Sequence, residues 1–217
     1  FRKVRKLLHG GVIGRPALIQ ITRQAYLRRS FLQDRPWFLD AEAAGGGIMM
    51  SGGSHDFETM HMLIGDIESV YARRAPQRFM EMEGDDTSIA TVQFRNGVVG
   101  TLVESFIMKS LMTAAEPEVH TLRIDGSLGS LWVEDGHTIH LFSEREDYLL
   151  GQPLIGHKIY VPPQDTFVLE VEHFLACLQM GKEPITSGRR QRKPLTVVLA
   201  AYRSMETGQP VVVEPQT

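Results

Sequence analysis

The stretch SIATVQFRNGVVGTLVESF, residues 88–106, determines the fold that we predict for this chain. Two runs rich in β-branched and aromatic residues flank Asn96-Gly97, a dipeptide typical of a tight hairpin turn, so 88–94 and 98–106 are expected to pair antiparallel. The same pattern predicts an antiparallel meander with further strands at 17–23, 67–72, 120–124, 128–133 and 138–142, the last three separated by turns at Asp125-Gly126 and Asp135-Gly136.

Helical patterns lie at both ends of this block of strands. A short helix ends at Gly10-Gly11, and longer apolar stripes predict helices at 48–64, at 167–180 and from Pro194, in a first helical turn, to Gly208. Residues 26–44 and 143–164 have no clear period and are interpreted as long loops. Helices on either side of sequential hairpins predict an α+β fold, a largely antiparallel open sheet with helices on one face. We expect residues 1–217 to form a single domain.

The predicted helix at 48–64 has two different faces. It follows the triplet Gly45-Gly46-Gly47, and its apolar face carries Met49, Gly53, Phe57, Met60 and Ile64. The opposite face carries Ser51, His55, Glu58 and Met62. A helix of this kind packs one face on a sheet and presents the other to a cleft.

Composition narrows the class of protein. Of 217 residues 42% are hydrophobic, and the formal net charge is −3 at pH 7. This near balance gives no electrostatic reason to expect nucleic acid or a membrane as a partner, so a small ligand fits better. The single cysteine, Cys177, is expected to pack in the core, and its usage favours a reducing, cytoplasmic location. No apolar stretch is long enough to span a bilayer, and we expect the true amino terminus to lie upstream of Phe1.

His55 is the titratable residue of most interest, because it lies one helical turn from Ser51 and shares a face with Glu58. From pattern alone, a histidine in a helix is more often a surface or packing residue than a catalytic one. The spacing of His55, Glu58 and His61 does not match H-E-x-x-H, so we expect no metal site.

Three other motifs have competing interpretations. The triplet 45–47 lacks G-x-G-x-x-G spacing, so no cofactor-binding residues are expected in this segment. The basic run 189–193 is interpreted as a solvated charge cluster rather than a phosphate site. Trp37 is consistent with stacking on a sugar ring or with anchoring its loop, and the sequence leaves both open.

Three stretches resemble the Gfo/Idh/MocA oxidoreductases. Residues 37–47 with HDFE at 55–58 are similar to the tryptophan loop, glycine triplet and active-site helix of that family. Residues 85–101 are similar to its central hairpin, and 200–211 are similar to its closing helix and strand. Together they cover nearly the whole chain as the carboxy-terminal domain of the family.

The resemblance implies a two-domain enzyme, similar to glucose-fructose oxidoreductase, whose amino-terminal Rossmann domain binds NAD or NADP and is absent from this sequence. It implies oxidation or reduction of a secondary alcohol on a sugar, polyol or related small molecule, with His55 as general acid or base. Ser51 stands where the family has an aspartate and would orient His55 or the substrate, and Trp37 would close over the ligand. The lysine of the family's Glu-Lys-Pro motif is also absent here. The open sheet face is expected to form a homo-oligomer.

Two alternatives stay open. Ser51 in place of the family aspartate, together with the missing cofactor half, favours a non-catalytic binding or assembly module. A weaker alternative is hydrolysis of glycosides by the NAD-dependent elimination route used by some relatives. The upstream sequence discriminates the first alternative from the enzyme, since a dinucleotide motif and the lysine would support catalysis.

Overall fold

The computed structural model describes residues 1–109, 118–134, 136–149 and 156–214. Within these residues nine strands form one sheet in the order β8-β7-β6-β5-β1-β4-β3-β2-β9. The strands are β1 (Pro16–Ala25), β2 (Ile67–Arg74), β3 (Thr87–Phe94), β4 (Val99–Ser105), β5 (Glu118–Gly126), β6 (Gly129–Val133), β7 (Thr138–Ser143), β8 (His157–Tyr160) and β9 (Val211–Val212). The helices are α1 (Arg2–His9), α2 (Arg28–Gln33), η1 (Pro36–Leu39), α3 (Ala41–Ala44), α4 (Ile48–Leu63), α5 (Glu146–Leu149), α6 (Thr166–Met180) and α7 (Gly188–Thr207).

The predicted hairpins are confirmed, and one pairing differs. Strands β3 and β4 pair antiparallel around Gly97, whose positive φ of 88° suits the tight turn. Strands β5, β6 and β7 continue the predicted meander. However, β1 lies between β4 and β5 and pairs parallel with β4. The chain after β1 crosses the sheet through α4, and such a crossover permits the parallel pairing.

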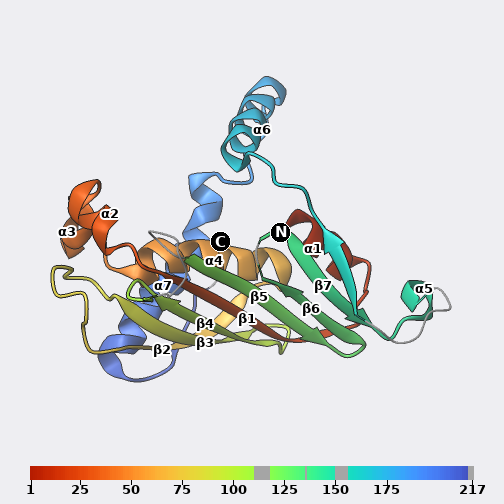
Figure 1. The fold of residues 1–217 in the computed structure, drawn as a ribbon, viewed down its shortest axis with the longest axis horizontal. Helices are drawn as coiled ribbons and strands as arrows, with labels where there is room; N and C mark the ends of the chain where they lie inside the picture. The colour runs from red at the N-terminus through yellow and green to blue at the C-terminus, as the bar shows by residue number, and fades with distance from the viewer. Residues whose placement is uncertain (110–117, 135, 150–155, 215–217) are drawn as a thin grey trace.

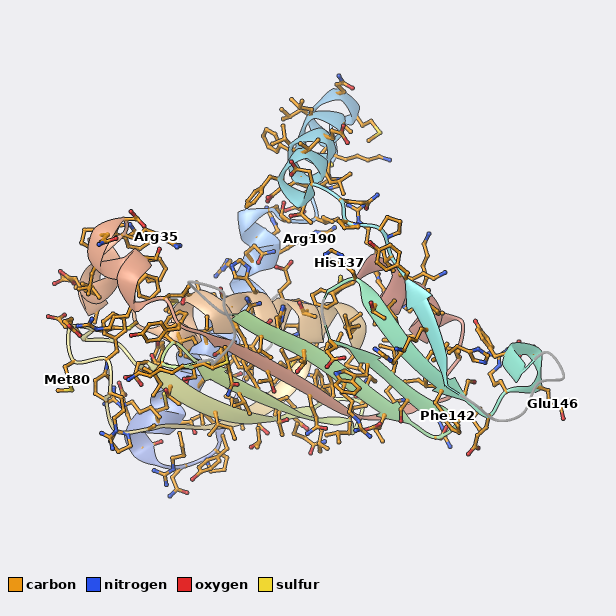
Figure 2. The ribbon with its side chains drawn as sticks, viewed as in Figure 1. Arg35, Met80, His137, Phe142, Glu146 and Arg190 are labelled. Atoms are coloured by element: carbon orange, nitrogen blue, oxygen red, sulfur yellow. The ribbon has the colours of Figure 1, made fainter. Side chains whose placement is uncertain are left out.

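Helices cover one face of the sheet, as the sequence predicts (Figure 1). α4 and α7 pack against each other, and α1 contacts α4. α4 lies on the central strands β1, β4 and β3, whereas α7 packs on β2 and β9 at one edge of the sheet. The main core lies between these helices and the sheet, and Ile19, Phe57 and Leu102 are among its fully buried side chains. A second apolar cluster around Phe31 and Phe79 lies at the end of the molecule where α2 and α3 project; Figure 2 places Arg35 and Met80 at this end.

Three segments differ from the sequence prediction. Residues 26–44 contain α2, η1 and α3, and 143–164 contain α5 and β8, so neither is a structureless loop. Short elements of this kind are held by tertiary contacts rather than by a periodic pattern, which explains why they were missed. α7 begins at Gly188, not at Pro194, because the Ser187 side chain caps it by accepting a hydrogen bond from Arg190 N. Pro194 therefore lies inside the helix, and the basic run forms its first turns.

Helix α6 stands away from the sheet (Figure 1). Its predicted apolar stripe is exposed, since Phe167 is 79% exposed and Leu178 61% exposed. Cys177 is the one buried residue of α6 among those that the structure describes, and its Sγ lies 3.5 Å from His173 Nε2. Among the described residues, none of the helices has the length and apolar character needed to span a membrane.

Candidate functional site

A pocket of about 620 Å³ lies between α4, α6 and the first residues of α1 and α7. His55 and Glu58 of α4 line it together with Glu170 and His173 of α6 and Gln191 of α7. The predicted cleft-facing histidine therefore does lie in a cavity. His55 is exposed whereas its neighbours in α4 on the opposite side are buried, so the helix directs this imidazole into the pocket.

The polar groups around His55 are held by hydrogen bonds. Glu58 Oε1 accepts a hydrogen bond from Gln191 Nε2 at 2.7 Å, which fixes the carboxylate one helical turn from His55. His173 Nε2 accepts a hydrogen bond from Ile185 N at 3.1 Å, so the proton of a neutral His173 ring lies on Nδ1. Within the described residues the His55 ring makes no hydrogen bond, so both of its nitrogens are available to a ligand.

The other two predicted site residues do not line this pocket in the structure. Ser51 Oγ donates to Gly47 O at 3.2 Å, so its hydroxyl is bonded to the backbone of its own helix. Trp37 is 53% exposed and packs on Phe38 at a ring-centroid distance of 4.3 Å. Trp37 thus helps to anchor its own segment through Phe38, and stacking of its exposed surface on a ligand stays a prediction.

The amino terminus of α4 is held by a residue far away in the sequence. Asp85 accepts hydrogen bonds from Gly47 N and Met49 N, each at 3.1 Å, and so caps a helix that has no cap of its own. Tyr202 of α7 donates its hydroxyl to Asp85 Oδ1 at 2.7 Å. Burial and the Asp85 charge raise the pKa of Tyr202 above its ordinary value. These contacts fix where α4 begins and hence where His55 lies along the pocket.

The glycine triplet 45–47 allows the start of α4 to lie close to Asp85 and Tyr202. Gly45 ends α3 in a left-handed conformation with φ 77°. A Cβ at Gly46 would collide with the Tyr202 ring, and a Cβ at Gly47 would collide with the backbone of Asp85. The Gly47 N–H already donates to Asp85 and Tyr202, so the triplet does not fit a phosphate group. No described cluster of His, Cys, Asp and Glu could hold a metal, and His61 Nδ1 lies 3.1 Å from Gly65 O.

A charged group lies on the buried side of α4, opposite the pocket. Arg23 of β1 donates to both oxygens of Asp56, at 2.8 and 2.9 Å, and His120 Nε2 of β5 lies 3.0 Å from Asp56 Oδ1. Glu104 of β4 is fully buried beside them, and neither of its carboxyl oxygens has a hydrogen-bond partner within the described residues. Sequence reasoning missed this group, although two-residue alternation places Arg23 with Ile21 and Glu104 with Leu102 on the core-facing side.

Solved oxidoreductases contain the same fold as these residues. One is an oxidoreductase from Agrobacterium radiobacter in complex with NAD+, L-tartaric acid and magnesium: the TM-score is 0.82 at 20% identity, over 98% of this chain and 61% of that one. Levoglucosan dehydrogenase, in complex with NADH and levoglucosan, gives a TM-score of 0.82 at 17% identity, over 99% of this chain and 62% of that one.

Residues 1–132 match the family model described as the GFO/IDH/MocA C-terminal domain, so the chain belongs to the GFO/IDH/MocA family. The predicted resemblance is thereby confirmed. Among curated relatives, the myo-inositol 2-dehydrogenase of Thermotoga maritima is 24% identical over 99% of this chain and 61% of the relative. The chain thus spans about three fifths of that relative's length.

Proposed function

We propose that the full-length protein is an NAD(P)-dependent dehydrogenase or reductase acting on a secondary alcohol of a sugar, polyol or related small molecule. In this proposal residues 1–217 form its substrate domain. The relatives support the reaction class, because they include a myo-inositol dehydrogenase and a levoglucosan dehydrogenase. A cytoplasmic location stays a prediction from the single cysteine.

The observation that carries the proposal is His55. Its ring points from α4 into a pocket of about 620 Å³, large enough for a small polyol, and its neighbours there include Glu58 and Gln191. A neutral imidazole with a free nitrogen can accept the proton of a substrate hydroxyl as the alcohol becomes a carbonyl. A bound nicotinamide cofactor would supply the hydride acceptor for this oxidation. Glu58, fixed by Gln191, is placed to accept a hydrogen bond from a second hydroxyl of the substrate.

We assign nucleotide binding to another domain of the full-length protein. The glycine triplet is occupied by its own packing contacts, so this chain offers no cradle for the pyrophosphate there. Helix α6, which forms one wall of the pocket, exposes large apolar side chains on its surface. Exposed apolar area of this kind marks an interaction surface, which a second domain packed against α6 would cover.

The direct test is turnover by the full-length protein. NAD or NADP is mixed with a panel of inositols, aldoses, anhydrosugars and hydroxy acids, and formation of the reduced nicotinamide is followed by absorbance. We expect turnover with at least one cyclic polyol or sugar. Absence of turnover with every compound and both nucleotides, in a folded protein that contains both domains, would contradict the proposal.

A first prediction separates the two domains. Residues 1–217 alone should bind NAD at least about a hundredfold more weakly than the full-length protein, because the phosphate contacts lie elsewhere. Isothermal titration calorimetry with both proteins measures the ratio. Equal affinities would show that the nucleotide site lies within this chain.

One observation favours a second candidate, a non-catalytic binding module. Ser51 brings no negative charge to stabilise an imidazolium at His55, and its hydroxyl is used by the helix backbone. A module of this kind would bind the same polyols in the pocket without turnover. Substrate binding by calorimetry, with no reduction of either nucleotide, would identify it.

We also propose that the uncovered sheet face forms a homo-oligomer. Apolar side chains lie exposed on it, including Ile89 at 46%, Val99 at 45% and Trp132 at 42%. Because a lysine in an apolar interface would be buried without a partner, Val99→Lys should dissociate the oligomer. Leu199→Lys on α7, where the leucine is 54% exposed, is the control outside both proposed interfaces and should leave the mass unchanged. Analytical ultracentrifugation reports both, and a monomeric wild-type protein would refute the idea.

A further inference from the structure

The buried charged group under α4 is built from three neighbouring strands. Arg23 of β1 is in register with His120 of β5 on one side and with Glu104 of β4 on the other. All three side chains meet Asp56, or lie beside it, where α4 crosses the sheet. Two carboxyl groups thus share the surroundings of a single arginine, yet their contacts differ completely.

Asp56 is the fully bonded carboxylate of the two. It has no exposed surface, and it receives two hydrogen bonds from Arg23 and one from His120. Burial acts to raise the pKa of Asp56, but the hydrogen bonds from His120 and Arg23 outweigh it and lower that pKa below its ordinary value. Asp56 is therefore ionised at neutral pH and is tied to two strands at once.

This attachment fixes how α4 is turned about its axis. Successive residues of an α-helix point about 100° apart, so tying Asp56 to the sheet sets the direction of His55 as well, and in this orientation His55 lines the pocket. A planar guanidinium that binds both carboxylate oxygens allows little rotation of the partner. The restraint acts one residue away from the imidazole that the pocket contains.

Glu104 has the opposite character. It is fully buried, its oxygens lack partners among the described residues, and a Cβ at Gly52 or Gly53 would press against them. Burial first, and then the negative charges of Asp56 and Asp85, raise the pKa of Glu104 well above its ordinary value, against the lowering effect of Arg23. Because neither oxygen has a donor among the described residues, the geometry favours the protonated, uncharged form of Glu104.

We propose that Asp56, held by Arg23 and His120, is the positioning residue that directs His55 into the pocket, and that Glu104 is an uncharged spacer on which Gly52 and Gly53 rest. The proposal depends on the proposed function in one respect, the use of His55 as acid or base. The proposal distinguishes the two carboxyl groups: replacement by the amide should lower kcat at Asp56 and leave kcat nearly unchanged at Glu104.

The experiment compares Asp56→Asn with Glu104→Gln in the full-length enzyme. Asp56→Asn leaves the partly buried Arg23 without its counter-charge and frees the helix, so kcat should fall roughly ten- to a hundredfold while the substrate KM stays within about twofold. The solvent deuterium isotope effect on kcat should rise, because proton transfer to a misdirected imidazole becomes slower. Glu104→Gln replaces a neutral acid by a neutral amide of the same shape, and kcat should stay within about twofold of wild type.

A stability control separates positioning from general damage. Asp86 is also buried, and its Oδ2 accepts hydrogen bonds from Arg78 N and Phe79 N, each at 2.6 Å, so Asp86→Asn loosens a different segment. It should lower the melting temperature as Asp56→Asn does and keep kcat. If Asp56→Asn does not fold, Arg23→Lys is the second variant. It keeps the positive charge but loses the bidentate hydrogen bonds to Asp56, so kcat should also fall.

The pH dependence of stability tests the state of Glu104. A carboxyl whose folded pKa is raised stabilises the protein fully below its unfolded pKa of about 4.3, and this contribution is lost as pH rises toward the folded value. Glu104→Gln removes the loss, so its melting temperature should match wild type near pH 4 and exceed it at alkaline pH.

Each failure has its own signature. Wild-type kcat in a folded Asp56→Asn enzyme, or a large loss of kcat in Glu104→Gln, overturns the inference. If His55 itself can be replaced without loss of turnover, the proposed function fails instead, whatever the two carboxyl variants do.

Discussion

Replacement of His55 by asparagine in the full-length protein should lower kcat by about a hundredfold or more, the usual range for loss of a general acid or base. Asparagine has a similar size and fills the same exposed position on α4, so substrate binding should suffer less than turnover. It cannot take up a proton at neutral pH. Steady-state kinetics in the direction of alcohol oxidation measures both constants, and the affinity for NAD should be unchanged.

The control for this variant is on the same helix. His61→Asn changes a histidine whose Nδ1 lies 3.1 Å from Gly65 O, outside the pocket that His55 lines. Its kcat should stay within about twofold of wild type, because His61 does not line that pocket and its replacement acts on stability rather than on chemistry. A His55→Asn enzyme with the kcat of His61→Asn would exclude His55 from the mechanism.

His173 is the second imidazole in the pocket, and the structure distinguishes it from His55. Because the Ile185 N–H already donates to its Nε2, His173 would have to lose that bond to accept a proton there. Its exposed helix α6 also lies apart from the central sheet (Figure 1). His173→Asn should therefore raise KM more than it lowers kcat, which double-mutant comparison with His55→Asn can test.

The fold was predictable because its signals are local. Asn96-Gly97 between two β-rich runs specifies a hairpin without reference to the rest of the chain, and the structure forms it as β3 and β4. The two faces of 48–64 likewise predict α4 and the exposed position of His55. The parallel pairing of β1 with β4 was not predictable in this way, since no turn connects those strands.

The site was predictable only in part, because its supports are distant in sequence. The cap of α4 comes from Asp85, and the carboxylate of Asp56 is held by Arg23 and His120. The sequence around each of these residues does not indicate which distant residue it contacts. A signal did exist: a charged residue at a core-facing strand position, such as Glu104 two residues after Leu102, has to be paired or neutral. Ser51 makes a local contact instead: its hydrogen bond to Gly47 O, four residues earlier, is the usual one for a serine in a helix and can be predicted from the sequence.

The second large effect is expected at Gly47, and it concerns stability. Gly47→Ala should destabilise the folded protein by about 3 kcal/mol, the upper end of the usual cost of overpacking. For a protein of this size that loss corresponds to a fall in melting temperature of roughly 6–12 °C. The reason is space, because the φ of Gly47 is −107°, outside the left-handed region that favours glycine.

The added methyl of Gly47→Ala would meet the Asp85 backbone, which has no flexible end that can move aside. Asp85 also caps α4 through Gly47 N and Met49 N, so the two segments cannot separate without loss of those bonds. Gly188→Ala is the matched control: Gly188 opens α7 with no atom near its would-be Cβ, and alanine there should be neutral or slightly stabilising. Thermal melts that place the two alanine variants at the same temperature would show that α4 does not depend on close contact with Asp85.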